Sequence, residues 1–65
     1  MRIIATLEND IVTFGHVRNG HTVIVRGRVS DLDRMTYFLV RDIIDYPDHL
    51  RKMITAGWNT FVKSL

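Results

Sequence analysis

The sequence predicts a small α+β domain, a three-stranded antiparallel β-meander followed by two α-helices (β-β-β-α-α) that pack on one face of the sheet. Two tight-turn signals and two helical stripes of apolar residues carry this prediction. A chain of 65 residues without a linker-like segment is expected to form a single domain, residues 1–65.

The hairpin between Asp10 and Val29 contains the strongest local signal, the pair Asn19-Gly20. Both central residues of a type I′ turn need a positive φ, which asparagine and glycine tolerate. Counting outward from this turn sets Phe14 opposite Val25. Because side chains alternate between the two faces of a strand, these two residues share one face.

A third strand is predicted at Met1–Glu8, joined to the hairpin by a tight turn at Asn9-Asp10. Counting back from that turn puts Ile3, Ala5 and Leu7 on the face that carries Phe14 and Val25. We call this the core face. A slip of one residue would send all three to the other side, so the two turns support each other.

Two amphipathic helices are expected after the sheet. Ser30 or Asp31 caps the start of the first, and Pro47 ends it and opens the second. The stripe of the first helix is Leu32, Met35, Leu39, Val40, Ile43, Ile44 and Tyr46, and that of the second is Leu50, Met53, Ile54, Trp58, Phe61, Val62 and Leu65. Phe38 lies outside the first stripe, either covered by the second helix, which we favour, or exposed for a partner.

Length and composition narrow the class of protein. A domain of this size buries only about 60% of its unfolded surface, so we expect a homo-oligomer, with a dimer favoured. The chain has no cysteine, hence no disulfide, and its net charge is only +2. No apolar run reaches the ~20 residues of a membrane span, and the strand-like start is unlike a signal peptide, so the expected location is cytoplasmic.

Residue patterns typical of catalysis or metal binding are missing. No two of the histidines His16, His21 and His49 have the i, i+4 spacing of a helical zinc pair. The glycines do not form a phosphate-binding loop ahead of a helix. We therefore expect a protein that is not an enzyme and holds no metal or cofactor.

The second face of the predicted sheet, here called the mixed face, combines apolar, hydroxyl and basic side chains. It carries Ile4, Ile11, Val17 and Ile24, interleaved with Thr6, Thr13, Gly15 and Thr22 and with Arg2, Glu8, Arg26 and Arg28. An apolar centre with an arginine-containing rim is typical of a protein interface.

This face predicts a small non-enzymatic protein–protein interaction module of the inhibitor or adaptor type, in the size class of phage-encoded examples. It is expected to self-associate and to bind a protein partner through the mixed face or an edge strand. The predicted partner-binding residues are Ile4, Ile11, Val17, Ile24, Arg26, Arg28 and Phe38.

The alternative is a nucleic-acid-binding module that uses Arg2, Arg18, Arg26 and Arg28 to contact DNA. The order β-β-β-α is similar, in topology alone, to plant AP2-type domains and to the arm-binding domains of some integrases. The apolar residues of the mixed face weigh against a groove-reading sheet. In a third interpretation, Arg26 and Arg28 simply pair with Glu8 and Asp31 at one end of the sheet.

Overall fold

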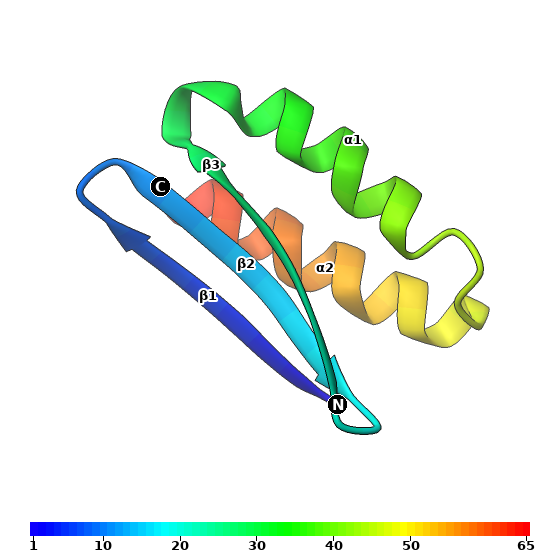
Figure 1. Cartoon of the computed structure of the whole chain (residues 1–65). Helices are drawn as coiled ribbons and strands as arrows, with labels where there is room; N and C mark the ends of the chain where they lie inside the picture. Colours follow the sequence, from blue (N-terminus) through cyan, green and yellow to red (C-terminus); the bar gives the residue numbers. More distant parts are fainter.

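The computed structural model describes residues 1–65 and has the predicted α+β architecture. The elements are β1 (Arg2–Glu8), β2 (Ile11–Arg18), β3 (His21–Arg28), a short 3-10 helix η1 (Val29–Asp31), α1 (Leu32–Asp42) and α2 (Asp48–Ser64). The strands form one sheet in the order β1-β2-β3, and both helices lie on the same side of it (Figure 1). The protein thus has two layers, with one sheet face left without a covering element.

Both predicted turns and both predicted registers are confirmed. Asn9 and Asp10 have φ values of 49° and 71°, and Asn19 and Gly20 have values of 51° and 79°. These positive angles are those of type I′ turns, whose twist matches that of the flanking strands. Ala5 pairs with Phe14, and Phe14 pairs with Val25, as counted from the turns.

The core lies between the predicted core face and the two helices. Its buried apolar members are Val12, Phe14, Val25, Met35, Leu39, Ile43, Ile54 and Trp58. Phe14 is central, because its ring makes a T-shaped contact with the Trp58 ring at a centroid distance of 5.1 Å and also stacks on the Phe61 ring. Gly27 of β3 leaves room for Met35, whose sulfur would lie 3.2 Å from an added Cβ.

The first helix is shorter than predicted and buries a narrower stripe. It ends at Asp42, and the chain then turns, with the N–H of Tyr46 donating to the Ile43 carbonyl at 3.0 Å. Val40 and Ile44 were predicted to face the core, but both are exposed. The three strands and the neighbouring helix together offer too little surface to cover a wide apolar stripe on α1.

The start of α1 also differs from the prediction. Asp31 occupies the N-cap position, but its side chain makes no capping hydrogen bond. The 3-10 turn η1 precedes α1 directly, so the chain enters the helix from another helical turn rather than from an extended, side-chain-capped residue. The second helix begins as predicted, with Pro47 immediately before its first residue.

The helices cover β2 and β3 more fully than β1. A Cβ added at Gly57 of α2 would lie within van der Waals distance of Phe14 and Ile3. Ile3 nevertheless remains 38% exposed and Leu7 49% exposed, although both lie on the core face. The apolar side of β1 is therefore incompletely covered by its own chain.

Neither helix is both long enough and apolar enough to cross a membrane.

Candidate interaction surface

The mixed face points away from both helices along all three strands. The register places Ile4, Gly15 and Ile24 in one row across the sheet, with Thr6, Thr13 and Arg26 in the next. Ile4, Ile11 and Val17 are half-buried by their neighbours, while Ile24 is 50% exposed. The structure thus brings these four predicted residues together on one uncovered face.

The centre of the mixed face depends on a glycine. A Cβ added at Gly15 would collide with the carbonyl oxygen of Val23 and lie 2.9 Å from Cγ1 of Ile24. Ile24 therefore leans over the space that a side chain at Gly15 would fill. Because Gly15 has no side chain, the bulky Ile24 of the neighbouring strand can lie across it, and this makes an apolar area at the centre of the mixed face.

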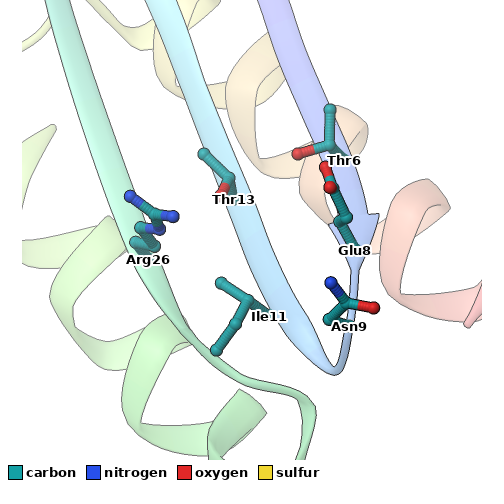
Figure 2. A pocket seen from close by; sticks show the side chains of 6 residues that line it. All are labelled: Thr6, Glu8, Asn9, Ile11, Thr13 and Arg26. Atoms are coloured by element: carbon teal, nitrogen blue, oxygen red, sulfur yellow. The ribbon is translucent and has the colours of Figure 1, made fainter.

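A shallow hollow of about 230 Å³ adjoins this apolar area on the mixed face. Its lining is polar apart from Ile11, and comes from all three strands and the first turn, namely Thr6, Glu8, Asn9, Ile11, Thr13 and Arg26. Figure 2 shows these side chains on the strands, with the helices behind the sheet. The hollow offers a guanidinium, a carboxylate, an amide and two hydroxyl groups to a ligand, which is hydrogen-bonding capacity without a nucleophile–base pair.

The arginines of the mixed face have no ion-pair partners. The chain's ion pairs lie on α2, where Asp48 contacts Arg51 at 3.2 Å and Lys52 at 3.1 Å. The interpretation in which Arg26 and Arg28 pair with Glu8 and Asp31 is therefore wrong. Because these side chains are exposed, solvation competes successfully with pairing.

Arg18 does not join the other arginines. Its guanidinium carbon lies 5.0 Å from the centroid of the Tyr46 ring, on the side of the sheet that faces the helices. The cause is strand alternation, since Arg18 is an even-numbered residue of β2 like the buried Phe14 and His16. Of the four arginines proposed to contact DNA, only Arg2, Arg26 and Arg28 share the mixed face.

Phe38 is 44% exposed, so its favoured placement beneath the second helix is wrong. The indole N–H of Trp58 donates to the hydroxyl of Thr36 at 2.9 Å, which shows which flank of α1 meets α2. Phe38 follows Thr36 by two residues and is rotated about 200° around the helix from it. Its ring contacts Tyr37 instead, at a centroid distance of 5.5 Å.

Phe38 and the mixed face belong to different surfaces. Three other exposed apolar residues of α1 and the following turn, Tyr37, Val40 and Ile44, line a second shallow hollow of about 480 Å³ together with Thr36 and Arg41. The predicted partner-binding set is therefore divided, since Phe38 is on the helical layer and the six strand residues are on the opposite side of the sheet.

His16 and Tyr46, here called the His16 cluster, form a contact that the sequence did not predict. His16 is completely buried, and its Nε2 lies 3.0 Å from the hydroxyl of Tyr46. Burial lowers the pKa of His16 below its usual 6.5, the nearby Arg18 charge lowers it further, and Asp42 acts in the opposite direction. The only sequence signal was the position of His16 on the core face, since its partner comes from a loop 30 residues away.

The geometry of the His16 cluster indicates a structural role. The second ring nitrogen, Nδ1, is buried without a hydrogen-bond partner, which favours a neutral ring. His21 and His49 are exposed elsewhere, and the structure gathers no group of three or more histidine, cysteine or acidic side chains that could hold a metal ion.

Comparison of the chain with family models, with curated proteins and with solved structures finds no match.

Proposed function

We propose that the chain is a small, non-enzymatic protein–protein interaction module of the inhibitor or adaptor type. It binds a protein partner with the mixed face and works as a homo-oligomer, favoured to be a dimer. The observation that carries the proposal is that both helices pack on one side of the sheet, so that an entire face with an apolar row stays uncovered. A cytoplasmic location and the absence of cofactor or metal are part of the same proposal.

The arrangement of groups on the mixed face indicates what a partner should present. An apolar side chain of the partner can pack on Ile24, which lies over Gly15 and is 50% exposed. A partner carboxylate can pair with Arg26, which has no acidic partner in its own chain. Thr6 and Thr13, which line the hollow, supply hydroxyl groups for the polar rim.

The proposal is tested with the purified chain as bait in an extract of its source cells. Wild type is expected to retain a specific protein in stoichiometric amount, and Ile24→Asp is expected to lose it, because the change puts a charge at the apolar centre. Thr60→Asp adds the same charge at an exposed position of α2 and is the matched control. Retention of the same protein by Ile24→Asp, with its circular dichroism unchanged, would show that the mixed face is not the binding surface.

Nucleic acid is the second candidate partner, favoured by the three arginines on the mixed face that lack ion-pair partners. Binding of this kind weakens steeply with salt, because phosphate contacts release counterions. A duplex-DNA gel shift that falls with salt, and that Arg26→Ala with Arg28→Ala abolishes, would select this candidate. Arg18→Ala serves as the control, because Arg18 lies on the other face.

A further inference from the structure

We propose that β1 pairs antiparallel with β1 of a second copy of this chain, centred on Ala5, so that two three-stranded sheets join into one six-stranded sheet. This inference rests on the self-association in the proposed function and names the surface and the register through which it occurs.

Along its outer side, β1 has unpaired backbone groups. The N–H and C=O of one residue in an antiparallel strand point to the same side, and those of the next residue point to the opposite side. The two-residue turn after Glu8 directs the N–H and C=O groups of the even-numbered residues of β1 toward β2. The backbone groups of Ile3, Ala5 and Leu7 therefore face outward, where no element lies beside them (Figure 1).

The backbone hydrogen bonds between β2 and β3 follow the same alternation. The N–H of Val29 donates to the carbonyl of Asp10 at 3.0 Å, one step beyond the last paired residues of β2 and β3. Even-numbered residues of β2 thus bond to β3, which leaves its odd-numbered residues to bond to β1.

The β1 edge lacks the features that normally prevent edge-to-edge pairing. Proteins protect open edges with proline, charged residues, bulges or very short strands. Between Arg2 and Glu8, β1 reads Ile-Ile-Ala-Thr-Leu over an uninterrupted register of seven residues. Its core-face residues Ile3 and Leu7 are also left partly exposed by the helices.

The sequence of β1 is complementary to itself in one register. When Ala5 faces the partner's Ala5, Ile3 faces the partner's Leu7 and Arg2 faces the partner's Glu8. This register pairs all seven residues of β1, and it brings opposite charges together at both ends of the joined strands. A shift by two residues in either direction leaves strand ends unpaired and separates the charges.

Pairing in this register preserves the two faces of the sheet. Ile3, Ala5 and Leu7 lie on the core face of both copies, so their apolar side chains meet on the side that carries the helices. Three pairs of facing residues exchange about six backbone hydrogen bonds, two for each pair. The mixed faces of the two copies become one continuous surface, which doubles the area offered to a partner.

The opposite edge of the sheet is less suited to a second copy. By the same alternation, the outward backbone groups of β3 belong to Thr22, Ile24, Arg26 and Arg28. β3 contains no acidic residue. No register between two β3 strands can therefore pair an arginine with an acidic residue, as Arg2 and Glu8 pair between two β1 strands.

Single cysteines test the register directly, because the chain contains none of its own. In the proposed dimer the two Ala5 Cα atoms are about 5.5 Å apart, within disulfide reach. Ala5→Cys is expected to form a disulfide-linked dimer under mild oxidation. Leu7→Cys is the matched control, since the two copies of that position would be about 14 Å apart. Equal or faster cross-linking of Leu7→Cys would overturn the register.

Charge exchange gives a second test, by sedimentation over a concentration series. Arg2→Glu and Glu8→Arg are each expected to raise the dimer dissociation constant about tenfold or more, because each places like charges opposite one another. The double variant is expected to recover wild-type dimerisation, since it restores both pairs. Recovery supports the proposed register, and failure to recover overturns it.

Proline variants separate edge pairing from other modes of association. Ala5→Pro removes an outward N–H of β1, and Thr22→Pro removes an outward N–H of β3 as a matched control. The inference requires Ala5→Pro to dissociate the dimer while Thr22→Pro and Ile24→Asp leave it intact. If Ile24→Asp dissociates the dimer and Ala5→Pro does not, self-association occurs through the mixed face and edge pairing is overturned. A chain that stays monomeric at every concentration contradicts both the edge pairing and the proposed self-association.

Discussion

At the scale of single residues, Gly15 and Gly57 should respond in opposite ways to the same added methyl group. Gly15→Ala puts a Cβ against the Val23 carbonyl and the Ile24 side chain, and is expected to destabilise the fold by about 1–3 kcal/mol. Gly57→Ala meets only ordinary contacts, the nearest at 3.7 Å, and is expected to stabilise by up to about 1 kcal/mol through helix propensity.

Urea unfolding followed by the fluorescence of the buried Trp58 measures both variants. Equal effects of the two substitutions would contradict the described close approach of Ile24 to Gly15.

His16 should make stability depend on pH. Its pKa in the folded protein is lowered from 6.5 by burial and by Arg18, so below that pH the unfolded chain takes up a proton that the folded chain does not. The free energy of unfolding is therefore expected to fall as the pH drops from about 7.5 to 5, by about 1.4 kcal/mol for each unit of pKa lowering.

His16→Phe removes this titration and is the control. Its free energy of unfolding should change less over the same pH interval, although the hydroxyl of Tyr46 loses a partner. An identical pH dependence of the two proteins would mean that His16 does not contribute.

At the scale of elements, the two helices are joined by the hydrogen bond from Trp58 to Thr36. Thr36→Val keeps the shape but removes the acceptor, which leaves a buried indole N–H without a partner. A loss of about 1–3 kcal/mol in the free energy of unfolding is expected. Thr36→Ser keeps the hydroxyl and should retain most of that stability, while Thr60→Val, on the exposed side of α2, should have little effect.

Two neighbouring residues of α1 provide the contrast between its faces. Leu39 is 2% exposed, and Leu39→Ala is expected to cost about 2–5 kcal/mol. Phe38 is 44% exposed and outside the interface with α2, so Phe38→Ala should cost well under half as much. Thermal or urea unfolding compares them, and a similar cost for both would place Phe38 in the core after all.

At the scale of the whole molecule, association through β1 should make the thermal stability depend on protein concentration. A ligand or partner that binds only the folded state raises the unfolding temperature, and more so at higher concentration. The Tm of the wild-type chain is therefore expected to rise with protein concentration. Ala5→Pro should have a Tm independent of concentration, and a rise equal to that of wild type would contradict pairing at this edge.

The sequence alone determined the sheet and the order of the elements. Asn9-Asp10 and Asn19-Gly20 are local turn signals, and each one sets a register by counting, so Ala5, Phe14 and Val25 could be aligned before any tertiary contact was known. The same counting assigned Ile4, Ile11, Val17 and Ile24 to the mixed face. These features were predictable because strand pairing across a tight turn involves residues close in sequence.

Only the tertiary structure decided what is covered. Val40, Ile44 and Phe38 lie at positions that a helical pattern alone cannot divide into buried and exposed, because burial depends on how far the sheet and α2 extend beside α1. The meeting of His16 with Tyr46 depends on where the chain turns after α1, 30 residues later. The exposed flank of β1 likewise follows from two helices that cover less width than three strands require.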